Sequence, residues 1–304
     1  MPMIRNESAG SRIAGLFIHL AILAVLITTL YPILHVAAVS LSSDFAVRRN
    51  NVTFFPRGFT LLAYRVILSS PTIPNAFLNS VIYTVVGTAL NMSFTTTMAY
   101  ALAKPHLPHR GFFTMLVIIT FFFSGGLIPS FLVVRGLGLY NTMWALLLPV
   151  AIATWNLVIL RTFFQTIPQE LEDSARVDGA NDLIILFKLV LPISKAAVAT
   201  ITLFYAVSHW NSWFPAVIYL SDFRKLPLQV ILRNIVIMQQ MAEALFSRGA
   251  VAEAWEIMHQ REGSLNVDIL KYATLFVSIV PMLIVFPFIQ KHFVKGIMIG
   301  SLKG

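Results

Sequence analysis

Residues 168–192, PQELEDSARVDGANDLIILFKLVLP, hold the densest group of acidic side chains in the chain. Five of the 13 acidic residues lie in this segment: Glu170, Glu172, Asp173, Asp178 and Asp182. Carboxylates can act as general acids or bases, but these occupy a helix-forming sequence between two apolar stretches. That setting favours recognition of another protein over catalysis. The segment is therefore interpreted as a docking element that faces the cytosol.

The same segment is predicted to form two short helices joined by a turn. Pro168 is acceptable at a helix start, and the acidic residues after it suit the positive end of the helix dipole. Gly179 can adopt a left-handed conformation and end the first helix, with Asp178 beside it. One side of the second helix is apolar and consists of Leu183, Ile184, Phe187 and Leu191. That side either rests on the membrane interface or fills a partner's groove, and the residues alone leave an ordinary amphipathic connector open.

A second group of residues has the chemistry that sugars require. Sugar rings have apolar faces that stack on aromatic side chains, and their hydroxyls bond to amide groups. Candidates for lining a solute path are Asn156, His209, Trp210, Asn211 and Trp213. Two alternatives stay open: the tryptophans belong to an interfacial aromatic belt, or the asparagines join helices by hydrogen bonds.

Small residues and a proline interrupt one apolar stretch at Ser124, Gly125, Gly126 and Pro129. A break at membrane depth frees backbone groups that protein or water must satisfy. The interruption therefore predicts a kink near a translocation path, with Gly125 and Gly126 as candidate path residues. Close helix packing through small residues is the alternative.

Catalytic and metal-binding patterns are not found in the sequence. The chain lacks a G-x-x-x-x-G-K-[ST] phosphate loop, so it is not expected to be an ATPase. No Ser-His-Asp set, metal cluster or carboxylate pair can be placed at one membrane depth. His106 and His109 share a short basic loop, but two imidazoles without a third ligand are usually solvated. The absence of cysteine excludes disulfides and thiolate metal sites.

The composition is that of a membrane protein. Mean hydropathy is +0.78, with 57% hydrophobic and only 12% charged residues, outside the range of soluble globular chains. The net charge of +9 is spread over loops and tails without interleaved stacking aromatics, so nucleic acid is not an expected partner. The apolar run 13–41 after Arg5 and Arg12 is too long for a signal-peptide core, and it is predicted to be an uncleaved span.

Six apolar segments are long enough to cross a bilayer core of about 30 Å. They are roughly 13–40, 75–103, 112–134, 141–161, 192–220 and 269–290. The expected fold class is thus an all-α polytopic membrane protein with six transmembrane helices. Short basic segments place both termini in the cytoplasm, with 41–74 and 221–268 outside. In these outer loops we expect an interfacial amphipathic stretch at 59–68 and a folded, water-exposed subdomain at 221–268.

The pattern E-x-x-A-x-x-D-G-A at 172–180, followed by Leu191 and Pro192, resembles the EAA loop of binding-protein-dependent ABC importer permeases. Three further segments, FSGGLIP at 123–129, NTMWA at 141–145 and KHFVKGIMIG at 291–300, resemble the carbohydrate-uptake subfamily of the maltose-permease type. The resemblance covers about 11–304. One departure is that Asp173, Ser174 and Ala175 stand where the family has Glu-Ala-Ala; these changes are small or preserve the charge.

The resemblance implies a type I importer permease with a cytoplasmic EAA coupling loop at 168–192. It implies three regions: 1–74 with the first span, a core at 75–290 and a cytoplasmic tail at 291–304. The implied ATPase-coupling residues are Glu172, Asp173, Ser174, Ala175, Asp178, Gly179, Ala180, Phe187, Leu191 and Pro192.

By the same resemblance, the chain is a non-enzymatic subunit of a sugar importer in the bacterial inner membrane. Its implied partners are a second homologous permease, an ABC ATPase dimer, an extracytoplasmic solute-binding protein and an oligosaccharide. This chain itself is expected to hold no cofactor or metal, because ATP and Mg²⁺ belong to the ATPase. A permease for a non-sugar solute and an ion-coupled carrier are the alternatives, and the lack of an acidic residue inside a span argues against the carrier.

Overall fold

The computed structural model describes residues 9–69, 71–247 and 267–301, which form helices and connecting turns without a strand among them. The chain divides into two compact units, residues 1–70 with 235–277 and residues 71–234 with 278–304. Two helices, α14 (Leu228–Ser247) and α16 (Val267–Ser301), contribute residues to both units. Each unit is described by itself below.

The first unit contains α1 (Ala9–Ser40), α2 (Asp44–Arg48) and α3 (Leu62–Ser69). A small core packs Val39, Ala46 and Val52 against Tyr272 of α16. Most of α1 is apolar and exposed, which is the pattern of a helix whose solvent is lipid. In the stretch 59–68, α3 is amphipathic, with Ala63 and Ile67 buried.

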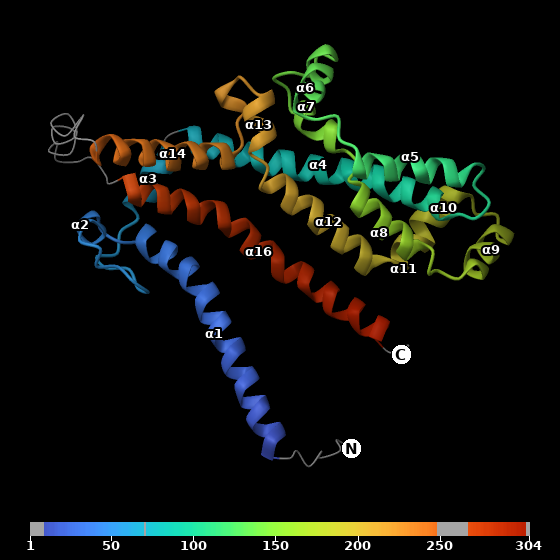
Figure 1. Cartoon of the computed structure of the whole chain (residues 1–304), viewed down its shortest axis with the longest axis horizontal. Helices are drawn as coiled ribbons and strands as arrows, with labels where there is room; N and C mark the ends of the chain where they lie inside the picture. The colour runs from blue at the N-terminus through green and yellow to red at the C-terminus, as the bar shows by residue number, and fades with distance from the viewer. Residues whose placement is uncertain (1–8, 70, 248–266, 302–304) are drawn as a thin grey trace. The chain divides into compact units, whose positions relative to one another are not determined.

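The second unit is built around the 32-residue helix α4 (Thr72–Ala103), which packs against α8 and α12 (Figure 1). In chain order, α4 is followed by α5 (Arg110–Phe122), α6 (Leu127–Gly136), α7 (Trp144–Leu147), η1 (Leu148–Val150) and α8 (Thr154–Phe164). Then come α9 (Gln169–Val177), α10 (Asp182–Ile185), the π-helix η2 (Leu186–Val190) and α11 (Leu191–Ile193). The rest is α12 (Lys195–Trp210), α13 (Phe214–Tyr219), η3 (Phe223–Lys225) and the start of α14.

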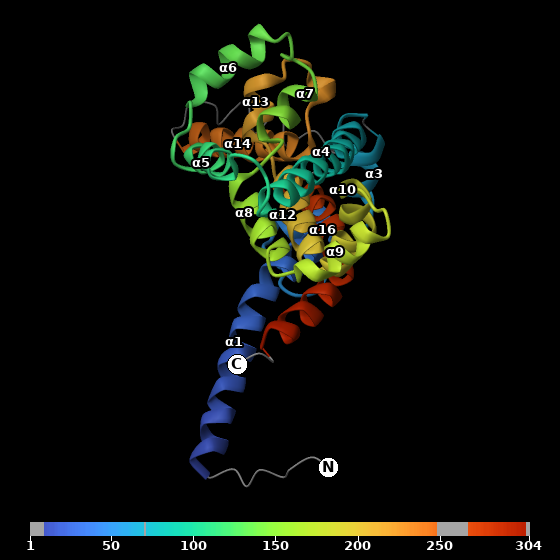
Figure 2. The same cartoon turned by 90° about the vertical axis from the view of Figure 1, so that its right-hand side faces the viewer.

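Among the described residues of this unit, two hydrophobic cores form, one toward each end of α4. Near the N-terminal end, Tyr83 packs with Leu147 of α7 and Tyr219 of α13. Near the C-terminal end, Tyr100 packs with Leu160 of α8 and with residues of α10, η2 and α12. In Figure 2, α6, α7 and α13 lie above α4 and α9 lies below it, and Figure 1 shows α9 and α10 near the C-terminal end of α4. The 32-residue helix α4 thus separates the two cores.

Three helical stretches are long and apolar enough to cross a membrane: Ile13–Ser40, Thr72–Ala103 and Ile269–Pro287. Three pairs of helices qualify only if each bent pair counts as one span. They are Arg110–Phe122 with Leu127–Gly136, Trp144–Val150 with Thr154–Phe164, and Asp182–Ile193 with Lys195–Trp210, bent by 117°, 49° and 90°. By length and composition, the described residues therefore contain three candidate spans, or up to six if each bent pair crosses as a unit.

The bends correct two of the predicted spans. The stretch 112–134 reverses direction at 123–126, so the expected kink is a 117° turn. The stretch 192–220 is not one helix, because α12 ends at Trp210 and α13 begins at Phe214. At the C-terminus, span and tail are one helix that runs to Ser301. Of the loop 221–268, residues 248–266 lie outside the described residues, and 228–247 form α14.

Candidate functional site

The turn of the acidic segment 168–192 has the hydrogen bonds of a Schellman motif. Gly179 has φ +84°, and its N–H donates to the Arg176 carbonyl at 2.9 Å. The N–H of Ala180 donates to the Ala175 carbonyl, also at 2.9 Å. These bonds satisfy the last carbonyls of α9 and require a left-handed residue after Asp178, for which glycine has no Cβ penalty. The predicted helix, turn and helix are confirmed.

Charges join the two short helices across this turn. The Arg176 guanidinium reaches Asp173 at 3.3 Å and Asp182 at 3.0 Å. The hydrogen bond to Asp182 is the main reason that the pKa of Arg176 is raised. Asn181 caps α10, since its side-chain oxygen accepts a bond from the Ile184 N–H at 2.9 Å. Exposed pairs of this kind add little stability individually, but together they fix the angle between the helices.

Glu172 fixes α9 to the end of α4. Its side chain is buried, with the residue only 4% exposed, and it forms an ion pair with Lys104. The Tyr100 hydroxyl donates to the same carboxylate at 3.5 Å, and the Lys104 ammonium lies 4.0 Å from the centre of the Tyr100 ring. The Glu172 carboxylate therefore faces α4 and is not displayed to an outside partner.

The second half of the segment has one buried side and one exposed apolar side. Ile185, Leu186 and Val190 are at most 1% exposed and pack into the core at the C-terminal end of α4. Leu183 and Phe187 are 61% and 58% exposed. Nothing in the described part of the chain covers this apolar side, so it is open to lipid or to a partner.

The remaining candidate coupling residues are accessible to different degrees. Exposed positions are Asp173, Ser174, Asp178, Gly179 and Pro192; half-buried positions are Ala175, Ala180 and Leu191. A cavity of about 360 Å³ beside them is lined in part by Lys104, His106 and Arg110. Among the described residues, no three His, Cys, Asp or Glu side chains are placed to hold a metal ion.

The candidate path residues at the end of α12 differ in how far they are exposed. Trp210 is 4% exposed, and its indole N–H donates to the Ser278 carbonyl at 3.0 Å, so its ring belongs to the packing between α12 and α16. After it, Asn211 is exposed and Trp213 is 40% exposed. These two residues leave polar and aromatic groups accessible at the end of α12.

Three other candidates lie elsewhere. Asn156 is buried in α8 at 7% exposure. Gly125 and Gly126 are exposed in the turn between α5 and α6, where Gly126 has φ +80°. Within the described residues, no hydrogen bond joins these three to the group at the end of α12.

The break between η1 and α8 is closed by side chains from α4 and α12, which the sequence did not reveal. The Asn91 amide donates to the Val150 carbonyl at 2.5 Å. The Tyr205 hydroxyl accepts the Ala153 N–H at 3.0 Å and lies 2.7 Å from the Thr95 hydroxyl. Backbone groups freed at a membrane-depth break need such partners. The only sequence signal was the presence of Asn91 and Thr95 in an apolar helix.

His209 joins the same network. Its Nε2 lies 2.5 Å from the Asn91 side-chain oxygen. A Cβ added at Gly87 would lie 2.6 Å from that Nε2, so only glycine lets the ring approach α4 this closely. His209 thus has a positioning contact inside the unit.

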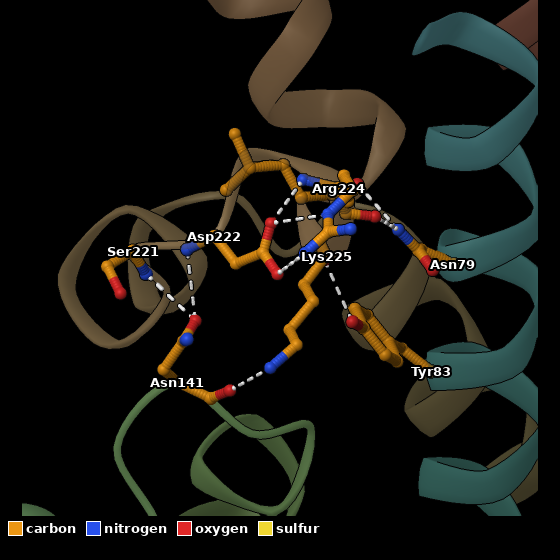
Figure 3. A network of polar contacts seen from close by, with 8 residues as sticks. Asn79, Tyr83, Asn141, Ser221, Asp222, Arg224 and Lys225 are labelled. Carbon is orange, nitrogen blue, oxygen red and sulfur yellow. Dashed lines mark hydrogen bonds and ion pairs between the residues drawn. The ribbon is translucent and has the colours of Figure 1, made fainter. Parts of the chain in front are cut away.

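At the other end of α4, Asn141 holds the chain segment that leads to α14 (Figure 3). Asn141 has φ +60°, and its side-chain oxygen accepts the N–H groups of Ser221 and Asp222 at 3.1 and 3.0 Å. The Lys225 ammonium donates to the Asn141 carbonyl at 2.8 Å. The left-handed backbone of Asn141 is thereby offset by three hydrogen bonds.

Helix α4 holds the same segment from its own side. The Asn79 amide donates to the Arg224 carbonyl at 2.8 Å, and the Tyr83 hydroxyl donates to the Lys225 carbonyl at 2.8 Å. Hydrogen bonds from Arg224 lower the pKa of Asp222. From Tyr83 to Tyr100 the helix rises about 25 Å, so this network and the Glu172 ion pair lie at opposite ends of a helix long enough to span a membrane.

Comparison with known proteins agrees with this architecture. Residues 76–299 match the family described as "Binding-protein-dependent transport system inner membrane component". The chain is 43% identical over 301 residues to the polygalacturonan/rhamnogalacturonan transport system permease protein YtcP of Bacillus subtilis (strain 168), covering 99% of this chain and 100% of that one. It is 41% identical over 276 residues to protein LplC of the same organism, covering 91% and 90%.

A solved structure shares the fold. It is a crystal structure of a bacterial ABC transporter involved in the import of the acidic polysaccharide alginate. The matched chain is 33% identical, with a TM-score of 0.83, and the match covers 94% of this chain and 99% of that chain.

Proposed function

The chain belongs to the family of inner membrane components of binding-protein-dependent transport systems, and we propose on that premise that it carries oligosaccharides into a bacterial cell. As a member of this family it is a membrane transport subunit rather than an enzyme. The observation that carries the cargo class is the 43% identity to a polysaccharide permease along the whole chain. Polygalacturonan and alginate are both acidic, so oligomers of uronic acids are the first cargo to test.

Transport is driven by ATP through the segment 168–192. The segment combines a rigid attachment to α4 through Glu172 with an uncovered apolar side at Leu183 and Phe187. An ATPase subunit that binds this side and moves on ATP binding would move α4, α8 and α12 with it, because Ile185 and Val190 pack in their common core. ATP shifts the equilibrium between inward- and outward-open states only if the ATPase contacts them differently.

The working transporter contains more than this chain. A second homologous permease completes the path, and an ATPase dimer binds ATP and Mg²⁺. An extracytoplasmic solute-binding protein delivers the sugar. In this arrangement both termini and the segment 168–192 are cytoplasmic, and the loop 221–268 is outside.

Uptake by the purified complex tests the proposal. The complex is reconstituted in proteoliposomes with its binding protein, and ATP-dependent uptake of labelled trigalacturonate is compared with that of a labelled amino acid. We expect uptake of the trigalacturonate alone, and only with ATP and the binding protein. Uptake driven by an ion gradient without ATP would overturn the proposal.

A further inference from the structure

Trp213 and Arg233 form a pair of side chains that suits an acidic sugar. The guanidinium carbon of Arg233 lies 4.8 Å from the centre of the Trp213 ring. Trp213 is 40% exposed, and Arg233, on α14, is half-buried. A cation over an indole face is attracted by the ring quadrupole, which holds the long arginine side chain in a fixed place. The pair therefore presents a flat apolar surface beside a positioned positive charge.

Arg233 has no counter-ion in the part of the chain that the structure describes. Two other cations, just before α14 in the chain, already have partners. Arg224 pairs with Asp222 at 3.2 Å, and Lys225 donates to the Asn141 carbonyl at 2.8 Å (Figure 3). A half-buried cation without a counter-ion carries a desolvation cost, which an anionic ligand offsets.

A uronic acid unit matches both members of the pair. Its carboxylate fits the planar fork of N–H groups on a guanidinium, and its ring carries C–H groups that pack on an indole. A neutral hexose of the same size can pack on the indole but has no carboxylate for the guanidinium. The pair can therefore distinguish acidic from neutral units.

The two residues lie at the end of α12 that is far from the segment 168–192. Trp213 follows α12, whose 16 residues extend about 24 Å away from the segment 168–192. If that segment faces the ATPase, the far end of α12 faces the outside. On the basis of the proposed function, we propose that Trp213 and Arg233 form a subsite that selects carboxylate-bearing units of an oligosaccharide.

The test compares an acidic cargo with its uncharged methyl ester, which otherwise adds only the ester methyl groups. Uptake of trigalacturonate and of its methyl ester is measured in proteoliposomes for the wild type, Arg233→Gln and Arg224→Gln, normalised to assembled complex. We expect Arg233→Gln to lower the acid-to-ester uptake ratio about tenfold, the effect of one lost charged hydrogen bond. Arg224→Gln is the matched control, since Arg224 already pairs with Asp222, and it should keep the wild-type ratio.

Other results would overturn the subsite. An equal loss of both cargoes in Arg233→Gln shows a structural role, and an unchanged ratio shows no role in selection. If that variant does not assemble, Arg233→Met keeps a long side chain without the charge, and a wild-type ratio in it contradicts the proposal. Equal import of both cargoes by the wild type removes the subsite but leaves the proposed function standing. Only the absence of ATP-dependent uptake of either cargo contradicts the function itself.

Discussion

At the scale of single residues, the segment 168–192 depends on two positions with different physics. Gly179 is required by backbone conformation, because its φ is +84° while the space around it is open. Glu172 is required by charge, because its carboxylate is buried against Lys104. Sequence reasoning identified the first because a turn signal is local. It missed the burial of Glu172 because its partner is 68 residues away in the chain.

The glycine gives the first prediction. Gly179→Val forces a β-branched residue into a left-handed backbone, which costs about 1–2 kcal/mol and misplaces α10 relative to α9. We expect transport to fall sharply while the chain still inserts, as measured by uptake per assembled complex. Gly111→Val is the control, because it also meets no atom within 4 Å but lacks a positive φ. Wild-type transport by Gly179→Val would show that the turn geometry does not matter.

The buried carboxylate gives the second prediction. Glu172→Gln leaves the Lys104 ammonium without a counter-charge near the Tyr100 ring, so α9 should separate more often from α4. We expect faster hydrogen exchange of the α9 amides and less copurifying ATPase. Glu170→Gln is the control, because it removes an exposed carboxylate of the same helix that has no ion pair among the described residues, and it should leave the exchange rates unchanged. Equal hydrogen-exchange rates of the α9 amides in both variants would show that Glu172 does not attach α9 to α4.

At the scale of elements, the sequence predicted where apolar helices lie better than where they bend. A hydropathy window measures length and apolarity but not direction, so it joined η1 to α8 across the 49° break and α12 to α13 across residues 211–213. The turn at Gly125 and Gly126 was anticipated, because glycines are a local signal, but its 117° angle was not. The partners that satisfy these breaks come from other helices, which one segment of sequence cannot show.

Tyr205 allows a test of this element-scale account. Its ring packs in the core that holds Ile185 and Val190, and its hydroxyl accepts the Ala153 N–H. Tyr205→Phe keeps the ring and leaves that N–H unsatisfied at a cost of about 1–3 kcal/mol. We expect assembled complexes that hydrolyse ATP but import fewer sugars per ATP.

The control for this change is Tyr64→Phe. It removes a hydroxyl that bonds to Ser40, outside the unit that contains the break. That variant should keep the wild-type number of sugars imported per ATP. If both variants import the same number of sugars per ATP, the Tyr205 hydroxyl is not needed at the break between η1 and α8.

At the scale of the whole molecule, α4 separates an end with the segment 168–192 from an end with the Asn141 network. If α4 spans the membrane, these ends lie on opposite sides. The chain has no cysteine, so single cysteines report their side directly. In intact cells, Ser221→Cys should react with a membrane-impermeant maleimide, and Ser174→Cys should react only after permeabilisation. The reverse pattern would invert the topology.

The central claim is that an ATPase binds the uncovered apolar side at Phe187. The most direct measurement attaches a benzophenone maleimide to Phe187→Cys in the cysteine-free chain and irradiates the assembled complex. Leu132→Cys, 60% exposed on α6 at the other end, serves as the control. The account predicts an adduct with the ATPase subunit from position 187 and none from position 132. An adduct from position 187 to lipid or to the second permease alone, without the ATPase, would contradict it.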